Sequence, residues 1–476
     1  MLRRLTLDAL YILFADAGAR LLAFFATIYL ARTLGPEAFG LVVVGSSVLL
    51  YAMWCADLGL ATLGTREMAQ PPSRRGFTPG EILSARLALA TGVCLLGQGM
   101  LALLPVAPLA KQVLQLYLLY LPVDALTVEW YYRGVRRYLP ITVARWCGGM
   151  LYVGLVIYLV HRPAQVVRVP LLYTAAYTVS ALLLLAGIIR KDGLRFRPLR
   201  LSRYREMIGQ AISIGLGAIA AQVVTILPPI VLALWAGAES AGLFGAALRV
   251  VTILLMADRV FVALFLPAIS RLWASQPESA PRRLQALFKI VLFGSAALCT
   301  AVTLGAPAII SWLYTADYTD SAPTLMLLGW FVLPTLLNSL FSFTLIAMKR
   351  ESLYFHATVK GGIIAAVCIG IAGALWGAPG AAAGVVSGEI AIVAFVYRAF
   401  RRFHRIAPGK PLLLAAGLTG LALIAAPATG ISGALGAPIT AALYLIAVVL
   451  FRGITGEEVR TLLQPISGEM PEKRGE

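Results

Sequence analysis

The sequence predicts an all-α integral membrane protein with about fourteen transmembrane helices, and three observations lead to this prediction. Hydrophobic residues make up 60% of the 476 positions, and charged residues make up only 13%. The mean hydropathy of +0.84 exceeds what a soluble globular domain requires. The apolar residues also form long continuous runs, which favour membrane-spanning helices over the short alternating strands of a β-barrel.

The predicted spans follow one another with short connections. They cover residues 9–30, 39–63, 82–104, 112–132, 139–160, 170–189, 207–235, 243–269, 285–306, 323–347, 357–376, 380–398, 411–428 and 437–451. The first span is too long for the apolar core of a signal peptide and leads directly into another span. We therefore expect it to remain uncleaved.

The basic residues predict the topology. A net charge of +18 would suit nucleic-acid binding, but the charges are spread over many short segments. With the N-terminus in the cytoplasm, most of the 40 Lys and Arg residues fall in cytoplasmic segments, as in other membrane proteins. The outer loops hold only Arg32, Lys111, Arg162 and Arg168. We therefore expect a multi-pass protein of the cytoplasmic membrane with both termini inside and no nucleic-acid partner.

An internal repeat divides the chain. Residues 35–41 (GPEAFGL) are similar to residues 237–243 (GAESAGL), at a constant spacing of 202 positions. Six spans per half give both halves the same orientation, and such parallel repeats place substrate between them. We predict an N-terminal six-helix lobe at 1–200, a C-terminal six-helix lobe at 201–402, two additional helices at 403–452 and a cytoplasmic tail at 453–476.

Five arginines lie within the predicted spans and are candidate binding residues: Arg20, Arg86, Arg145, Arg249 and Arg259. A guanidinium inside a membrane is costly unless it meets an anion, an acid or water. Because arginine binds phosphate with two parallel hydrogen bonds, these residues predict a cationic cavity for a phosphate-bearing substrate. Pairing with nearby acids and snorkelling to the interface remain the structural alternatives.

Acidic residues also lie in or near the spans, notably Asp16, Asp57 and Asp258, with further members Asp124, Glu129 and Glu389. Such residues could couple transport to H⁺ or Na⁺, or form structural ion pairs. Asp16 stands four residues before Arg20, so both interpretations apply to it. Asp57 and Glu129 lie near cytoplasmic ends, which favours structural contacts. The five cysteines form no metal-ligating pattern, and no cofactor or metal is predicted.

Three stretches carry a resemblance to a known family. They are residues 31–40 (ARTLGPEAFG), residues 57–60 (DLGL) and the pair Arg66-Glu67, with weaker echoes at 130–137 and 266–270. Together they resemble polysaccharide biosynthesis flippases of the Wzx type, in the multidrug/oligosaccharidyl-lipid/polysaccharide (MOP) exporter superfamily. The resemblance implies two six-helix lobes with two extra helices, and a transporter rather than an enzyme.

The resemblance also implies a substrate and partners. The substrate would be a polyprenyl-pyrophosphate-linked oligosaccharide, turned from the inner to the outer leaflet by alternating access, and the partners would be membrane lipids and polysaccharide assembly proteins. A lipid II flippase and a cation-coupled multidrug exporter share the fold and stay open as alternatives. A membrane glycosyltransferase or polymerase is the alternative from another class, although it would need a sizeable loop with clustered acids.

Overall fold

The structure is a computed structural model that describes the backbone of most of the chain. The described residues are 2–192, 201–259, 261–262, 265, 269, 272, 280–348, 350–403, 406–428 and 433–463. Within these ranges the side chains of 2–17, 19, 191–192, 213–214, 216–221, 223, 351, 434–435, 459 and 461–463 lie outside the description.

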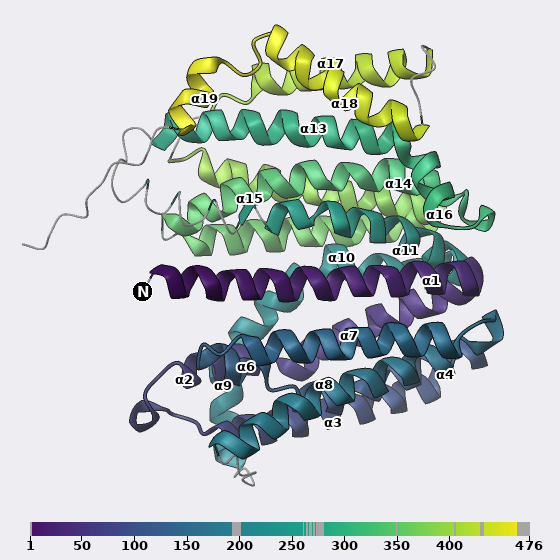
Figure 1. Ribbon diagram of the computed structural model, residues 1–476, viewed down its shortest axis with the longest axis vertical. Coiled ribbons are helices and arrows are strands. Elements are labelled where there is room, and N and C mark those ends of the chain that lie inside the picture. Colours follow the sequence, from purple (N-terminus) through teal and green to yellow (C-terminus); the bar gives the residue numbers. More distant parts are fainter. Residues whose placement is uncertain are drawn as a thin grey trace, which may run out of the picture. The chain divides into compact units, whose positions relative to one another are not determined.

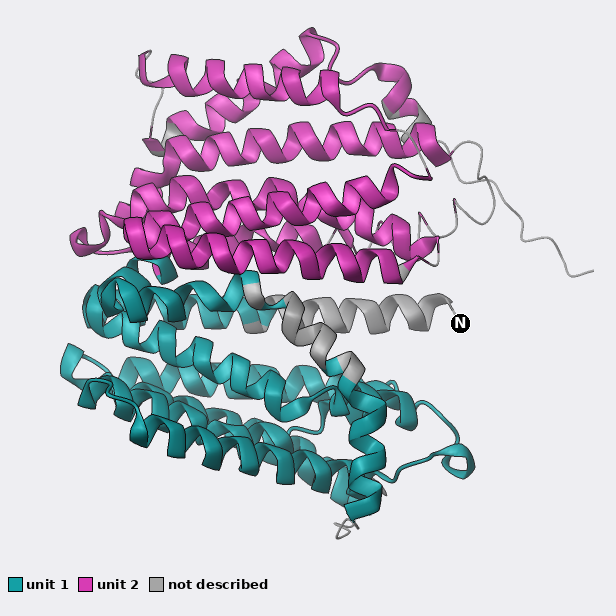
Figure 2. Ribbon diagram, turned by 180° about the vertical axis from the view of Figure 1, so that it is seen from behind, with its two compact units in different colours: residues 1–245 teal, residues 246–476 magenta. Residues whose placement is uncertain are grey.

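The chain forms two compact units, residues 1–245 and residues 246–476, which Figure 2 shows in teal and magenta. Every regular element among the described residues is helical. The predicted fold class is therefore confirmed. The lobe boundaries expected from the sequence repeat stay a prediction.

Unit 1 holds ten α-helices and the start of an eleventh among its described residues (Figure 1). Their bounds are α1 Leu2–Asp57, α2 Leu60–Met68, α3 Pro79–Leu103, α4 Pro108–Leu118, α5 Tyr120–Leu126, α6 Glu129–Gly134, α7 Leu139–Leu159, α8 Arg168–Asp192, α9 Leu201–Ala221, α10 Val223–Trp235 and α11 Gly237–Leu254, with short 3-10 helices η1 Pro72–Arg74 and η2 Pro163–Gln165.

The helices of unit 2 follow from the second part of α11. Their bounds are α13 Ala280–Leu313, α14 Ser321–Leu328, α15 Val332–Ala347, α16 Glu351–Phe400, α17 Gly409–Ala428, α18 Gly433–Leu450 and α19 Gly456–Leu463, with 3-10 helices η3 Ala316–Tyr318 and η4 Gly329–Phe331. Helix α13 packs against α14, α15, α17 and α18, and α15 packs against α16.

Two pairs of predicted spans are joined without a loop. The first two spans form α1, which is interrupted only at Gly35, where φ is +73° and ψ is 170°. An L-residue with a side chain rarely adopts that conformation, and Pro36 then suits the first position of a new helical segment. Gly377 interrupts α16 in the same way, with φ of +60°. One glycine thus replaces a connecting loop in each case.

The sequence repeat has a structural counterpart. Gly237, which matches Gly35, also has a positive φ, of +87°, and it begins α11. Five residues further on in each copy, Gly40 and Gly242 bring α1 and α11 into backbone contact. A Cβ atom at Gly40 would lie 1.8 Å from the Ala238 carbonyl oxygen, and one at Gly242 would lie 2.0 Å from the Pro36 carbonyl oxygen.

This close approach is reciprocal, because each glycine faces the partner of the other under the 202-residue spacing. Only glycine lets two helix backbones meet so closely. We call it the glycine crossing of Gly40 and Gly242. The repeat that the sequence suggests is therefore built into the packing of unit 1.

The outward surfaces carry large apolar side chains, as a protein in contact with lipid requires. Leu103 is 88% exposed, Trp312 77% and Ile424 76%. A soluble protein rarely exposes contiguous surface of this kind. Among the described residues, nine helices are long and apolar enough to cross a membrane, and two shorter apolar helices accompany them. The protein is therefore a multi-pass membrane protein.

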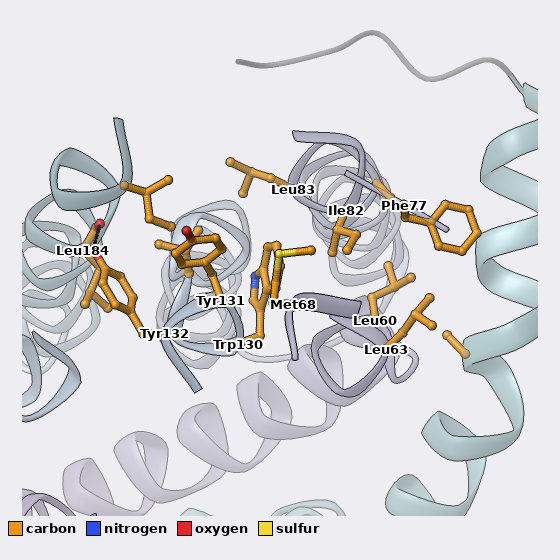
Figure 3. Packing of buried hydrophobic residues seen from close by; sticks show 14 of the residues in the cluster. Leu60, Leu63, Met68, Phe77, Ile82, Leu83, Trp130, Tyr131, Tyr132 and Leu184 are labelled. Carbon is orange, nitrogen blue, oxygen red and sulfur yellow. Dashed lines mark hydrogen bonds between the residues drawn. The ribbon is translucent and has the colours of Figure 1, made fainter. Parts of the chain in front are cut away.

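A compact apolar cluster anchors one end of unit 1. Figure 3 shows Leu60, Leu63 and Met68 of α2 packed with Ile82 and Leu83 of α3 and with the aromatic residues of α6. The Tyr132 hydroxyl donates a hydrogen bond of 2.9 Å to the carbonyl oxygen of Leu184 in α8. This cluster fixes α2, α3, α6 and α8 relative to one another.

Candidate functional site

A cavity of about 740 Å³ lies within unit 1. Helices α2, α3, α5, α6, α7 and α8 contribute its lining. Six of the lining side chains are charged: Arg66, Arg86, Asp124, Glu129, Arg133 and Arg145. The charged groups fall into two clusters, one around Arg86 and one around Glu129.

Arg86 holds one side of the cavity together. Its side chain is only 7% exposed, and its Nε lies 3.0 Å from the Asp57 Oδ1. Its Nη2 lies 3.5 Å from the Asp124 Oδ2. Its Nη1 donates to the carbonyl oxygens of Thr127 at 3.0 Å and Ala125 at 3.4 Å, at the end of α5. Two acids and two carbonyl groups therefore occupy Arg86, which acts as a structural tie.

Asp57 is fixed from both sides. It is the last residue of α1, and its carboxylate accepts hydrogen bonds from the backbone N–H groups of Gly59 at 3.2 Å and Ala61 at 3.1 Å. These bonds satisfy donors at the start of α2 that have no partner within the helix. Gly59 makes the tight turn possible, because its φ is +87°. Asp57 therefore both caps α2 and neutralises Arg86.

Glu129 is the centre of the second cluster. It begins α6, and its carboxylate faces two arginines. Arg145 of α7 pairs with both oxygens, with Nε to Oε1 at 2.7 Å and Nη2 to Oε2 at 2.8 Å. Arg133, one helical turn after Glu129, donates from Nη2 to Oε2 at 2.8 Å. The Glu129 side chain is 18% exposed. One carboxylate thus holds two guanidinium groups.

The lining has two further features: a basic rim, formed by Arg66 and Arg133, and an aromatic wall, formed by Tyr120 and Tyr177. The side chains of Arg66 and Arg133 are 56% and 50% exposed. Arg66 donates from Nη2 to the Gln210 side chain at 3.2 Å. Tyr120 and Tyr177 line the cavity. Behind them the Tyr173 ring lies 5.0 Å from that of Tyr120 and 4.5 Å from that of Tyr177, between centroids.

The charges of the lining do not balance. Four arginines line the cavity, against Asp124 and Glu129. Two acids outside the lining, Asp57 beside Arg86 and Glu67 at 3.9 Å from Arg66, bring the total to zero when all groups are ionised. The charge is uneven, because Arg86 faces two acids whereas Arg133 and Arg145 share only Glu129, which leaves a local excess of one positive charge at the Glu129 cluster. This part of the cavity can attract an anion.

The structure brings together two of the arginines predicted from the sequence, Arg86 and Arg145, with three of the acids, Asp57, Asp124 and Glu129. Arg20 lies half-buried on α1, outside the lining of this cavity. The Asp16 side chain lies outside the described residues. In unit 2, Arg249 is half-buried on α11 near Tyr314, and Arg259 is exposed.

Asp258 lies in a second polar cluster, within unit 2. It hydrogen-bonds Ser339 of α15, and it is close enough to Glu389 of α16 for their charges to interact. The Asn338 amide donates to the Glu389 Oε1 at 2.9 Å, and the Ser342 hydroxyl donates to Asn338 at 2.7 Å. This arrangement groups two acids, an amide and hydroxyls in the apolar interior of a helical unit.

The central role of Glu129 and the tyrosine cluster are not evident from the sequence. Tyr117 and Tyr120 are three positions apart, and Tyr173 and Tyr177 are four apart. Such spacings place side chains on one helix face. The repeated spacing was therefore the available signal, but it did not show that the two faces meet.

The comparisons with known proteins agree on family and fold. The family model "Polysaccharide biosynthesis protein" matches residues 5–273. No curated protein matches the sequence. The structure of lipid II flippase MurJ in an inward closed conformation has a TM-score of 0.71 at 14% identity, and the alignment covers 93% of this chain and 99% of that one.

Transporters of a second kind share the architecture. The inward-facing structure of a multidrug resistance MATE family transporter of the MOP superfamily has a TM-score of 0.63 at 15% identity, covering 82% of this chain and 97% of that one. An outward-facing structure of such a transporter has a TM-score of 0.55 at 16% identity, covering 83% and 93%. Identities this low show the fold alone.

The resemblance identified in the sequence is thus confirmed. Because the family model matches more than half of the chain, the protein belongs to the polysaccharide biosynthesis protein family, and its fold is that of the MOP superfamily.

Proposed function

We propose that the protein is a flippase that turns a polyprenyl-pyrophosphate-linked oligosaccharide from the cytoplasmic to the outer leaflet by alternating access, for cell-surface polysaccharide biosynthesis. Membership of the polysaccharide biosynthesis family and the MOP fold support a transporter of lipid-linked substrates rather than an enzyme. Two lobes of parallel orientation suit a mechanism in which substrate is carried past the midplane between them.

One observation carries the choice of an anionic substrate: the local excess of positive charge at the Glu129 cluster of the cavity in unit 1. Charged side chains inside membrane proteins mark substrate and ion pathways, because they are costly to keep there. Arg133 and Arg145 share one acid, Glu129, on their side of the cavity, while Arg66 lies 3.9 Å from Glu67. Guanidinium groups bind the oxygens of a diphosphate with charge-assisted hydrogen bonds. Such a cavity suits a pyrophosphate head group.

The same observation weighs against a multidrug exporter, whose cationic substrates would meet this local excess of positive charge unfavourably. A lipid II flippase is the second candidate, and the structural likeness to MurJ favours it. Lipid II also carries a pyrophosphate, so its glycan rather than its charge would distinguish the two candidates. We place the flippase of a polyprenyl-pyrophosphate-linked oligosaccharide first, because the matching family model describes polysaccharide biosynthesis.

The remaining sequence predictions fit this function as proposals. Arg20, Arg249 and Arg259 would contribute to the pathway of the pyrophosphate, together with Arg86 and Arg145. Asp16 and Asp258 are candidates for coupling to H⁺ or Na⁺, and the cluster around Asp258 and Glu389 supplies oxygen ligands for such a cation. The distribution of Lys and Arg supports the cytoplasmic membrane with both termini inside.

The test is transfer of a labelled polyprenyl-pyrophosphate oligosaccharide between the leaflets of proteoliposomes. We expect transfer by the wild type and loss of at least about tenfold in Arg20→Gln, Arg249→Gln and Arg133→Gln. Arg74→Gln is the matched control, because Arg74 is exposed on unit 1 and does not line the cavity. Efflux of a cationic dye without transfer of any pyrophosphate-linked glycan would refute the proposal and favour the multidrug exporter.

A further inference from the structure

Glu129 occupies the position where an anionic ligand of the cavity would bind. Its two carboxylate oxygens receive three hydrogen bonds from Arg133 and Arg145, all between 2.7 and 2.8 Å. Carboxylates and phosphates offer guanidinium groups similar pairs of acceptor oxygens. A phosphate that enters the cavity therefore meets arginines that already hold an anion of the protein itself.

The two arginines differ in how firmly they hold Glu129. Arg145 pairs through two nitrogens, and its side chain is 27% exposed. Arg133 uses one nitrogen, and its side chain is 50% exposed. Exposed ion pairs of this i,i+4 type contribute little free energy. Arg133 can therefore turn from Glu129 toward a ligand at small cost, while Arg145 keeps the carboxylate oriented.

The electrostatic role of Glu129 follows from its setting. Without a ligand, two neighbouring guanidinium groups repel each other unless a counter-ion lies between them. Once a phosphate binds, Glu129 becomes a like charge close to that phosphate, and it then opposes binding. The same carboxylate thus stabilises the empty cavity and weakens the loaded one, which favours release of the ligand.

We propose that Glu129 is an internal counter-ion that a phosphate-bearing ligand displaces from Arg133, so that Glu129 competes with the ligand for the arginines. The proposal rests on the proposed function for the identity of the ligand, a pyrophosphate-linked glycan. The binding chemistry is that of a phosphate anion, which a phospholipid head group also offers. The aromatic wall of Tyr120 and Tyr177 gives a glycan a surface for its apolar C–H face beside the phosphate.

Substitutions of Glu129 and of Arg133 should change the affinity for a phosphate-bearing ligand in opposite directions. Glu129→Gln removes the competing charge, so we expect it to bind pyrophosphate about tenfold more tightly than the wild type. Arg133→Gln removes a ligand-binding charge and should bind about tenfold more weakly. Arg74→Gln, at an exposed residue that does not line the cavity, should leave the affinity unchanged. A purely structural Glu129 would weaken binding when substituted.

The experiment measures binding by calorimetry to the full chain in nanodiscs of zwitterionic lipid. The probes are inorganic pyrophosphate and a water-soluble short-chain prenyl-pyrophosphate N-acetylglucosamine. A second set of nanodiscs contains phosphatidylglycerol, which identifies competition from a phospholipid head group. Opposite shifts for Glu129→Gln and Arg133→Gln with both probes support the inference. A pattern that depends only on phosphatidylglycerol overturns the glycan as ligand.

A folding control keeps the test decisive. If Glu129→Gln does not fold, Glu129→Asp retains the carboxylate but withdraws it from Arg133, and we expect affinity to rise about two- to threefold. Unchanged or weaker binding by a folded Glu129 variant overturns the inference. Leaflet transfer, measured separately, decides the proposed function. Transfer by the wild type without tighter binding by the Glu129 variants would reject the counter-ion role alone.

Discussion

Removal of the Arg86 charge is the most informative test of the site's architecture. In Arg86→Gln, the carboxylates of Asp57 and Asp124 lose a guanidinium partner at 3.0 and 3.5 Å. Breaking a buried ion pair by removing one partner costs about 3–5 kcal/mol. The two carboxylate side chains are 16% and 21% exposed, so water compensates partly, and we take the lower end, about 3 kcal/mol.

The assay is thermal unfolding in detergent at a fixed scan rate, followed by tryptophan fluorescence, because large membrane proteins often unfold irreversibly. Scaled to a unit of about this size, a loss of 3 kcal/mol lowers the apparent Tm by about 6–12 °C. Arg74→Gln provides the control for loss of an exposed arginine. The double variant Arg86→Gln/Asp57→Asn should regain about 1 kcal/mol, since it removes one uncompensated charge.

The result that would refute this reasoning is specific. If Arg86→Gln unfolds within about 1 °C of the wild type, Arg86 is not a structural tie. Its charge would then be available to a ligand, as expected from the sequence for all five arginines in the spans. A double variant less stable than Arg86→Gln would instead indicate that the capping role of Asp57 outweighs its charge.

Three further predictions concern stability in other regions. Gly40→Ala should lower the free energy of unfolding by about 2 kcal/mol or more, because the added methyl group clashes with backbone at the glycine crossing. Gly92→Ala has open space around it and should be neutral or raise the free energy of unfolding by up to about 1 kcal/mol. Chemical denaturation measures both. Burial raises the pKa of Glu458, but the hydrogen bonds from Lys289 at 2.6 Å and from the Thr455 N–H at 3.0 Å, together with the Lys289 charge, outweigh it and lower the pKa overall. These contacts therefore stabilise the fold above about pH 4.3, and their contribution is lost as the pH falls through the lower folded pKa. The apparent Tm of wild type and Glu458→Gln should converge in acid. Tyr173→Ala, which removes the central ring of the tyrosine cluster, should cost about 3–5 kcal/mol by the same thermal assay, while Tyr173→Phe should cost less than about 1 kcal/mol.

The sequence predicted the features that follow from local rules. Runs of apolar residues reveal membrane helices, because the hydrocarbon core sets both their length and their composition. Gly35 and Gly237 were recognisable as equivalent, since each stands before a similar helix start, and the structure gives both a positive φ. The contact of α1 with α11 at Gly40 and Gly242 was not predictable from the repeat, because similarity between two segments does not indicate that they touch.

The candidate site was only partly predictable for a related reason. Intramembrane charges such as Arg86 and Arg145 stand out in a sequence because they are rare in apolar spans. Their partners lie on other helices, 29 positions away for Asp57 and 16 for Glu129. Spacing within one helix cannot show which acid meets which arginine. The sequence therefore does not show that Arg86 is held by two acids whereas the Glu129 cluster keeps a local excess of positive charge.

The glycine crossing has a consequence for how the two copies of the repeat respond to mutation. Each glycine faces the carbonyl that corresponds to the one its counterpart faces, as at the contact of an isologous homodimer. In a dimer of identical half-length chains, one substitution would enter the contact twice and its cost would double. In this single chain, Gly40 and Gly242 mutate independently, so one substitution introduces only one clash and half of that free-energy cost. A compensating change can then follow in the other copy of the repeat.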